Sequence, residues 1–413
     1  MRKKIPKGGL SPAEIQDALS EARRNGADWK KGRLWGMVYY AGDDVLRIAM
    51  DAYAMFFSEN MVVPEAFPGL ARLETEVIDM AAQLLGGGEA ARGVMTSGGT
   101  ESNFLAIKAA REWAREQGSI KGTPEIVAAR SAHPTFNKAA HFLGLTVKRV
   151  PLGPDYRADV LAIERALTPN TIMLVGSAPG YPHGKIDPIV ELGRVAQTRN
   201  LWLHVDACVG GFLAPFVKKL GKPLPEFDLT VPGVCSLSAD LHKHGYTGKG
   251  ASMVLFRDES RFQYSAHDFD DWPRGRYLTR TFTGTRSGGP VACAWAVLNF
   301  LGEEGYLRLA RDTLRAQDLL IEGINSINGL EICGEPELGI ITFGSDQLDM
   351  FAVADGLDDL GWVTNRCTEP PGIHLLLTPN HLSFVSEYLD DLATTVAEVR
   401  VGKRTSRTTK TTY

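Results

Sequence analysis

The residue that most directly suggests chemistry is Lys243, which follows an apolar run and is itself followed shortly by a glycine and a tyrosine. A lysine held in a tight turn and removed from water has a lowered pKa, so its amine becomes neutral and nucleophilic enough to form an imine with an aldehyde. His242 beside it can point the other way, toward a phosphate. Because most lysines are solvated surface residues, this pair alone also fits an ordinary surface turn.

A carboxylate, Asp206, ends a second apolar run, residues 201–205. Open α/β sheets place ligand-binding groups at the carboxyl ends of their strands, and a buried carboxylate needs a cationic partner. The protonated nitrogen of a pyridine ring would be such a partner, and the pair would strengthen the ring as an electron sink. The alternative is an Asp that only caps the turn at residues 209–211.

A third group, residues 97–102, reads Ser-Gly-Gly-Thr-Glu-Ser and opens a predicted helix that extends to about Gln117. Gly98 and Gly99 let the backbone approach an anion, and the N-terminal N–H groups of the helix, beginning near Thr100, point at it. The segment has neither the Gly-Lys-Ser/Thr of a Walker loop nor the Gly-x-Gly-x-x-Gly of dinucleotide folds. A glycine-rich turn with a helix cap is the simpler interpretation.

The fourth group is His133, just after a predicted strand at residues 125–129. A flat imidazole there could stack on an aromatic cofactor, although a single His is often only a structural hydrogen-bonding residue. An anion cradle, a stacking His, a pyridinium-binding Asp and an imine-forming Lys thus follow one another at successive strand ends. Their joint order predicts an enzyme that holds pyridoxal 5′-phosphate (PLP) as a Schiff base on Lys243.

The elements that must position these groups alternate between strands and helices, which predicts right-handed crossovers and a mostly parallel sheet. A smaller α+β unit is expected at residues 330–391. The expected strands are residues 93–96, 125–129, 146–150, 171–175, 201–205, 234–238 and 251–256, and the expected helices are residues 71–85, 135–143, 159–167, 188–199, 290–301 and 307–327.

The chain is expected to divide into four parts: an N-terminal arm (1–66), a large PLP-binding domain (67–305), a small C-terminal domain (306–400) and a basic tail (401–413). A helix should run from Ser11 to about Arg24, because Ser, Pro and Glu stand at its capping positions. The rest of the arm shows aromatic residues without periodicity, and we expect it to pack on a partner subunit. The tail is rich in Thr, Lys and Arg, which predicts disorder.

Composition excludes several classes of protein. With 45 basic and 49 acidic residues among 413, the net charge of −4 gives no reason to expect nucleic acid as a partner. Five widely spaced cysteines indicate reduced thiols in the cytoplasm and neither a disulfide framework nor a metal site. The sequence contains no apolar run of the roughly 18–20 residues that would span a bilayer, and its N-terminus lacks the apolar region of a secretory signal.

With these motifs in place, the sequence resembles the sphingosine-1-phosphate lyases, within the group II PLP-dependent decarboxylases of fold type I. The resemblance covers residues 29–392 and implies an aspartate aminotransferase-like large domain with a seven-stranded sheet. The Cys after His-Val-Asp-Ala, and the Lys six residues after Lys243, favour the lyases over the amino-acid decarboxylases. The stretches that carry the likeness are residues 67–69, 96–102, 182–188, 204–212, 238–246, 249–250 and 370–374.

The resemblance also implies a role for each matching position. Thr283 and Gly284 would reach the cofactor from a partner subunit, which implies a homodimer with shared active sites. Tyr39 would reach the phosphate of the substrate from the neighbouring subunit, together with Asn60. The remaining implied roles are the Schiff base for Lys243, the pyridinium for Asp206, the ring face for His133, which is also counted as catalytic, and the cofactor phosphate for Gly98, Gly99, Thr100 and His242. Lys249, Tyr181 and the freed Lys243 are the candidates for proton transfer at the substrate.

One position departs from the lyase pattern. A His that helps to bind the substrate phosphate in these lyases is replaced here by Val63. An apolar side chain removes a charge-assisted contact worth ~1.5–3 kcal/mol. The resemblance therefore says more about the cofactor than about the substrate.

Three functions follow from this pattern. The first is retro-aldol cleavage of a phosphorylated sphingoid base, a lipid-like substrate, to a long-chain aldehyde and phosphoethanolamine. The second is α-decarboxylation of an amino acid, in which Arg286 could orient the carboxylate, or aldol cleavage of another β-hydroxy amine. The third is a non-catalytic relative kept as a binding protein, which the retained Lys, Asp, His and Gly-Gly-Thr set argues against.

Overall fold

A seven-stranded sheet forms the centre of the computed structural model, which describes residues 4–24 and 26–407. The strands are β1 (Arg92–Thr96), β2 (Glu125–Ala129), β3 (Thr146–Val150), β4 (Thr171–Ser177), β5 (Trp202–Asp206), β6 (Val234–Ala239) and β7 (Ser252–Phe256). They lie in the order β1-β7-β6-β5-β4-β2-β3, and only β7 runs antiparallel to its neighbours. Strands β4 to β7 are buried along their whole length, as expected for a sheet covered on both faces. The predicted α/β fold is confirmed.

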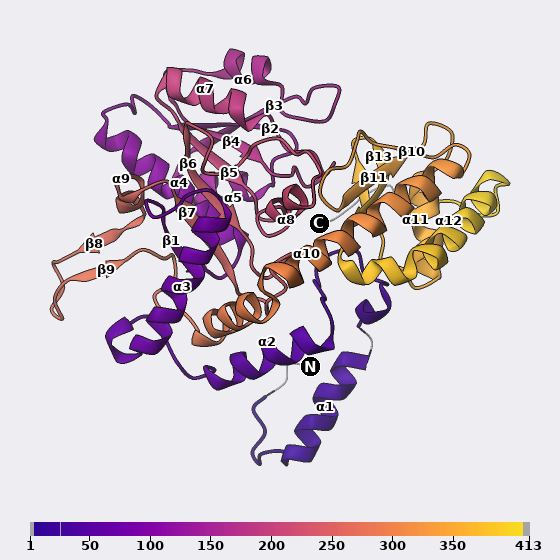
Figure 1. Ribbon diagram of the computed structural model, residues 1–413, viewed down its shortest axis with the longest axis horizontal. Coiled ribbons are helices and arrows are strands. Elements are labelled where there is room, and N and C mark those ends of the chain that lie inside the picture. The colour runs from indigo at the N-terminus through magenta and orange to yellow at the C-terminus, as the bar shows by residue number, and fades with distance from the viewer. Residues whose placement is uncertain (1–3, 25, 408–413) are drawn as a thin grey trace.

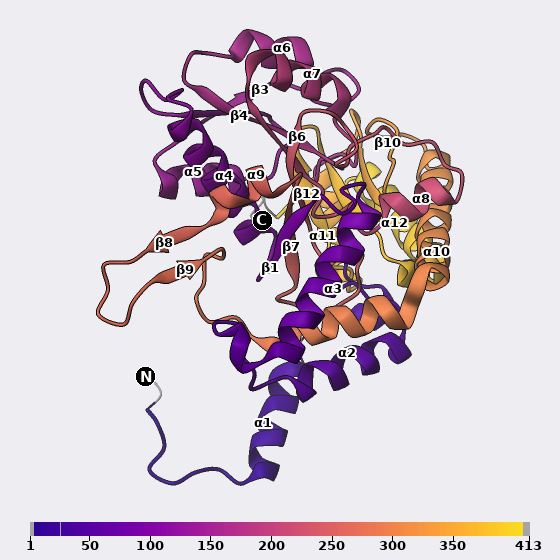
Figure 2. The same cartoon turned by 60° about the vertical axis from the view of Figure 1, so that its left-hand side comes forward.

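Helices cover both faces of this sheet, as Figures 1 and 2 show. A separate hydrophobic core lies between each face of the sheet and the helices that cover it, and these two cores hold the sheet between the helix layers. On one face lie α4 (Gly99–Glu116), α5 (Thr135–Leu143) and the short α9 (Glu259–Phe262). On the other face lie α3 (Pro68–Leu84), α6 (Val160–Ala166), α7 (Ile189–Arg199) and α8 (Ala214–Lys219).

A long helix, α10 (Gly288–Ser326), connects this sheet with a smaller unit. Sequence analysis predicted two helices here, and they are joined across a kink at Gly302, whose positive φ of 53° favours glycine. The smaller unit has its own core and an antiparallel sheet in the order β10-β11-β13-β12. Its elements are β10 (Glu331–Ile332), β11 (Ile340–Gly344), α11 (Met350–Asp359), β12 (Asn365–Thr368), β13 (Pro371–Leu376) and α12 (Val385–Arg400).

Part of the N-terminal arm packs on its own chain, and the contact expected with a partner subunit stays a prediction. Its first helix, α1 (Pro12–Arg24), matches the prediction and buries no residue. A second helix, α2 (Asp43–Met55), was missed, because its buried stripe is short, and it packs along α10. Between them Trp35 is 1% exposed and stacks on Trp362 and His381 in the core of the smaller unit. Burial of this large ring explains why the arm returns to its own chain.

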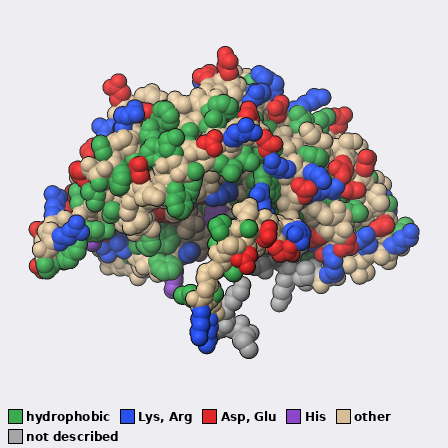
Figure 3. Space-filling model, turned by 90° about the horizontal axis from the view of Figure 1, so that it is seen from below, with side chains coloured by type: hydrophobic (Ala, Val, Ile, Leu, Met, Phe, Trp, Pro, Cys, Tyr) green, Lys and Arg blue, Asp and Glu red, His purple; other side chains and the backbone are tan. Residues whose placement is uncertain are grey.

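A two-stranded hairpin, β8 (His267–Phe269) and β9 (Tyr277–Thr279), projects from the large sheet (Figures 1 and 2). It exposes Phe269, Trp272 and Leu278. In the space-filling view of Figure 3 hydrophobic and charged side chains alternate along this projection. Short 3-10 turns complete the described elements at Trp29–Lys31, Pro64–Ala66, Gln263–Ser265 and Pro379–Phe384.

The start of the basic tail contacts α11. Arg404 and Arg407 both form ion pairs with Asp359, and Arg407 also pairs with Asp355. These contacts differ from the disorder expected for the tail, because the acidic face of α11 attracts its arginines. Residues 408–413 of the predicted tail lie outside the described residues. Within the described ranges, the helices are all too short or too polar to cross a bilayer.

Candidate functional site

The four predicted groups meet at one edge of the large sheet. The parallel strands β2, β4, β5 and β6 all end at this edge. Strand β1 ends there too, because β7 lies between β6 and β1 and is antiparallel to both, so that β1 runs parallel to β6. A cavity of about 300 Å³, at the lower end of the usual range for small-molecule sites, opens at this edge. Its lining consists of Gly98, Gly99, Thr100, Asn103, His133, Thr135, Ser177, Pro179, Tyr181, Asp206, Cys208, Val209, Asp240, His242 and Lys243.

The predicted anion cradle forms the floor of this cavity. Helix α4 begins at Gly99, so its first N–H groups face the cavity. A Cβ atom on Gly99 would lie 2.6 Å from Cys208 Sγ and 3.0 Å from Asp240 Oδ1, so only glycine fits there. Glu101 closes the turn by accepting the backbone N–H of Ser97 at 2.8 Å. The cradle therefore combines close backbone approach with a helix N-terminus, which suits a phosphate.

Lys243 lies in the turn after β6. The sequence predicted a neutral amine at this position, but the contacts of the amine favour its charged form. Its Nζ is 2.8 Å from Oδ2 of Asp240, a buried residue at the end of β6. Burial alone would lower the pKa of the Lys243 amine, but the charge of Asp240 outweighs it and raises that pKa well above its ordinary value. Conversely, burial would raise the pKa of Asp240, yet Lys243 and His242 lower it. The prediction of a neutral amine was wrong because it took burial into account but not the charge of Asp240, three residues away.

His242 lines the cavity, and Lys249 lies beside His242, next to the arm. Burial lowers the pKa of His242 to about 4, so its imidazole is neutral, and its Nδ1 accepts the backbone N–H of Ala251 at 3.3 Å. Lys249 donates to the carbonyl of His242 at 3.0 Å, and its Nζ lies 5.1 Å from the ring centre of Tyr39. Desolvation of this amine lowers the pKa of Lys249 to about 8, although much of its side chain stays exposed.

Tyr39 was expected to act from a neighbouring subunit, and that role stays a prediction. It is 9% exposed and packs against His244 and Lys249 of its own chain. The reason is the anchoring of the arm, since the Leu34 carbonyl is bonded to His381 and Leu34 forms a bridge with Val363. Tyr39 therefore lies beside Lys249 of its own chain, outside the lining of the cavity.

His133 and Tyr181 stand together at another part of the cavity lining. The His133 ring lies edge-on to Tyr181, with 6.4 Å between ring centres, and its Nδ1 accepts the backbone N–H of Thr135 at 3.2 Å. Burial lowers the pKa of His133, although the charge of Asp206 opposes this shift. Both residues also line a second cavity of about 1300 Å³, which extends between residues 130–134, 151–156 and 364–374.

Asp206, the last residue of β5, faces the cavity with only neutral donors around it. Oδ1 accepts from the backbone N–H of Cys208 at 3.1 Å and from Ser238 Oγ at 3.4 Å, and Oδ2 accepts from Asn103 Nδ2 at 3.2 Å. Within residues 4–24 and 26–407 it forms no ion pair with a Lys or Arg. A buried carboxylate without a protein cation fits the protonated ring nitrogen of PLP. Sequence analysis missed Asn103, because nothing marks it within α4.

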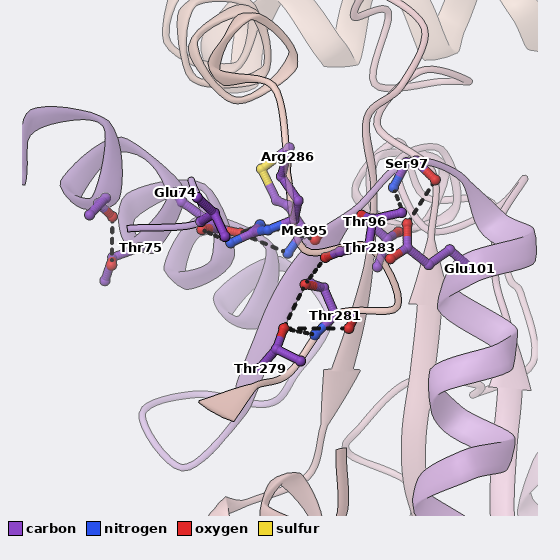
Figure 4. A network of polar contacts seen from close by, with 12 residues as sticks. Glu74, Thr75, Met95, Thr96, Ser97, Glu101, Thr279, Thr281, Thr283 and Arg286 are labelled. Atoms are coloured by element: carbon purple, nitrogen blue, oxygen red, sulfur yellow. Dashed lines mark hydrogen bonds and ion pairs between the residues drawn. The ribbon is translucent and has the colours of Figure 1, made fainter. Parts of the chain in front are cut away.

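Arg286 and Asn60 were predicted to bind substrate, but neither lines the two cavities. Arg286 forms a two-point ion pair with Glu74 and donates to the Met95 carbonyl at 3.3 Å, as Figure 4 shows. Asn60 accepts the backbone N–H of Arg286 at 3.3 Å. Glu74 was not considered because it lies far from Arg286 in sequence. Arg286 is therefore held by Glu74 in this chain, and its role in orienting a substrate carboxylate stays a prediction.

The loop that carries Thr283 and Gly284 lies beside the cradle but outside the cavity lining of this chain. Its Phe282 N–H donates to Glu101 Oε1 at 3.1 Å, and Thr281 Oγ1 donates to the Thr283 carbonyl at 2.8 Å (Figure 4). Their predicted role at a partner's cofactor stays a prediction.

Comparisons with known proteins agree with this geometry. Residues 28–345 match the model of the pyridoxal-dependent decarboxylase conserved domain. The chain belongs to the pyridoxal-dependent decarboxylase family. It is 39% identical to the sphingosine-1-phosphate lyase of Oryza sativa subsp. japonica over 97% of this chain and 75% of that protein, and 39% identical to sphingosine-1-phosphate lyase 1 of Rattus norvegicus over 96% and 70%.

Among solved structures, Burkholderia pseudomallei sphingosine-1-phosphate lyase matches with a TM-score of 0.93 and 35% identity over 98% of this chain and 94% of that chain. The glutamate decarboxylase of Lactobacillus brevis, at 19% identity, shares the fold with a TM-score of 0.85 over 97% and 95%. The predicted fold type I and the resemblance to the lyases are confirmed, and the cofactor of this pyridoxal-dependent decarboxylase family member is PLP.

Proposed function

We propose that this PLP-dependent enzyme is a lyase that cleaves a phosphorylated sphingoid base to a long-chain aldehyde and phosphoethanolamine. The observation that supports it best is one cavity in which Lys243, Asp206, His133 and the Gly98–Gly99 cradle meet, with a larger cavity that shares His133 and Tyr181 with it. When bound, PLP supplies an electron sink for cleavage of a carbon–carbon bond.

On the arm side, Lys249 and Tyr39 would bind the phosphate of the substrate. The Lys249 ammonium can donate to a phosphate, and the Tyr39 ring beside it holds the charge in place. Because Lys249 has a pKa of about 8, most of it is charged at neutral pH, and a bound dianion would increase that fraction. This cation stands in part for the His that Val63 replaces.

The large cavity, which adjoins the first at His133 and Tyr181, would receive the hydrocarbon part of the substrate. Its volume of about 1300 Å³ exceeds the usual 300–1,000 Å³ of small-molecule sites, and Leu152 and several prolines contribute apolar surface. Tyr181 and His133, which line both cavities, are the candidates for taking the proton from the substrate hydroxyl at the junction.

The competing α-decarboxylase needs a free cation near the cofactor for the carboxylate of an amino acid. Arg286, the residue considered for this role, is bound by Glu74. The lyase is therefore the function that these contacts favour.

A homodimer is part of the proposal. The loop with Thr283 and Gly284 presents Phe282, which is 71% exposed, and the neighbouring hairpin exposes Trp272 and Leu278. Apolar groups on this scale are typical of association surfaces, and a second copy would bring Thr283 to the cofactor of its partner.

We also propose that the protein is located in the cytoplasm, because none of its five cysteines, all within the described residues, is in a disulfide. Cell fractionation tests the compartment.

The decisive test of the lyase is product analysis. Wild-type protein loaded with PLP should release a long-chain aldehyde from a phosphorylated sphingoid base, less from the unphosphorylated base, and no carbon dioxide from amino acids. Lys249→Gln should raise KM for the phosphorylated base about tenfold or more, the effect of a lost charged hydrogen bond. Carbon dioxide from an amino acid without any aldehyde would overturn the proposal.

The dimer is tested by mixing. Lys243→Ala and Thr283→Ala, each deficient alone, should regain part of the activity when mixed, because one mixed site then has both residues. Sedimentation should show a dimer, and a monomer with full activity would contradict this part of the proposal.

A further inference from the structure

From Asp206 a buried chain of polar side chains runs into the large domain, and its first member, Asn103, also lines the cavity. Asn103 on α4 donates to Asp206 at 3.2 Å, and its Oδ1 lies 3.0 Å from His204 Nε2 on β5. His204 Nδ1 lies 2.9 Å from Ser236 Oγ on β6, which accepts the indole N–H of Trp202 at 2.8 Å.

The donors of this chain all point the same way. Because the amide nitrogen of Asn103 donates to Asp206, its oxygen must accept, so His204 donates from Nε2. Nδ1 of a neutral His204 then accepts from the Ser236 hydroxyl, and Ser236 accepts from Trp202. Burial lowers the pKa of His204 to about 4, which agrees with a neutral ring. Every link therefore ends on the carboxylate of Asp206.

Because these side chains are buried, each polar atom needs its partner within the protein. Trp202, His204 and Ser236 are 0% exposed and Asn103 is 1% exposed, so an unpaired polar atom in the chain has no water to replace its partner. Donors along such a chain polarise one another, and donors to a carboxylate stabilise its charged form. The direction of these hydrogen bonds thus favours an ionised Asp206 whose carboxylate faces the cavity.

We propose that Asn103 and His204 are positioning residues, which hold Asp206 charged and in the orientation that keeps the ring nitrogen of PLP protonated. Ser236 and Trp202 fix the tautomer of His204 in the same chain. This inference rests on the cofactor of the family and not on the proposed substrate, so a different substrate leaves it intact.

The test measures the ring nitrogen directly. Protein is loaded with PLP labelled with ¹⁵N in the ring, and the chemical shift of that nitrogen reports its protonation. Asn103→Leu, which keeps the shape of the side chain, should move the signal toward that of neutral pyridine and weaken PLP binding about tenfold or more.

His204 supplies a paired comparison. His204→Phe should shift the signal in the same direction by less, and His204→Gln, which can still donate to Asn103, should restore it. Thr395→Val is the matched control, because it removes a buried hydroxyl that donates to the Asp391 carbonyl within α12 of the smaller unit, and it should leave the signal unchanged.

Two results would overturn the proposal. One is a folded, PLP-bound Asn103→Leu protein with the wild-type nitrogen shift. The other is an equal response of His204→Phe and His204→Gln, which would mean that packing of the ring matters and donation does not. Should Asn103→Leu fail to fold, the His204 pair and Trp202→Phe decide alone, because they do not touch Asp206.

Discussion

Two carboxylates end adjacent strands of the large sheet and line the same cavity, yet their surroundings differ. Asp206 accepts three hydrogen bonds from neutral groups. Asp240 accepts from Ser252 at 2.5 Å and pairs with the Lys243 amine at 2.8 Å. Asp206 is thus prepared for a cation that arrives with the ligand, whereas Asp240 binds a cation of the protein itself. The same side chain at the same depth acquires two roles from its neighbours.

Removal of Lys243 is the largest change, because it makes the two carboxylates alike by leaving both without a protein cation. Lys243→Ala should lose turnover by about 10⁴-fold or more, as expected when a covalent catalytic group is removed. The imine absorbance should vanish, while the cradle and Asp206 still bind PLP non-covalently. Absorbance spectra and product assays measure both effects. An imine band that persists would remove Lys243 from its role.

Neutralising Asp206 tests the other side of the comparison. Asp206→Asn keeps the size of the side chain but cannot hold a charged ring nitrogen, so turnover should fall by roughly 10²- to 10³-fold, the range for loss of a prearranged electrostatic contact. The imine with Lys243 should still form. The ring-nitrogen shift and kcat are the measurements, and a charged ring nitrogen in this variant would contradict the assignment.

Neutralising Asp240 should have the opposite effect on the lysine. Without this carboxylate, burial dominates and lowers the pKa of Lys243. The neutral fraction of the amine then rises about tenfold for each unit by which that pKa falls. Apoprotein of Asp240→Asn should therefore form its imine with PLP faster than wild type at pH 7. Stopped-flow absorbance measures the rate, and an unchanged rate would show that the ion pair does not govern the amine.

The same pair gives a dependence of stability on pH. The pKa of Asp240 is lowered in the folded protein and that of Lys243 is raised. The stabilisation is therefore complete above the ordinary Asp pKa of about 3.9 and below the ordinary Lys pKa of about 10.4. It is lost as pH falls through the lowered pKa or rises through the raised one. Melting of wild-type and Asp240→Asn apoprotein across pH should differ most within this window.

The smallest effect is expected from the hydroxyl that supports Asp240. Ser252 also contacts Ser102 at 2.8 Å, so Ser252→Ala opens a gap in a buried row of hydroxyls. It should lower the free energy of unfolding by about 1 kcal/mol, visible as a lower urea midpoint, and change imine formation less than Asp240→Asn. A larger change than in Asp240→Asn would mean that Ser252 acts on Lys243 by another route.

The sequence determined the cofactor chemistry and the sheet. Apolar runs mark the strands, parallel strands end at one edge, and so Gly98, His133, Asp206 and Lys243 had to meet there. These signals are local, which is why reading along the chain was sufficient to find them.

Only the tertiary structure decided which partners these groups have. Asn103 lies 103 positions before Asp206, and Glu74 binds Arg286 across 212 positions. Asp240 was close in sequence, but its effect on Lys243 depends on whether burial or charge dominates. Tyr39 packs beside Lys249 of its own chain because Trp35 packs into the distant smaller unit. Contacts between distant segments depend on packing that no local pattern records, and a pKa depends on all neighbours in three dimensions.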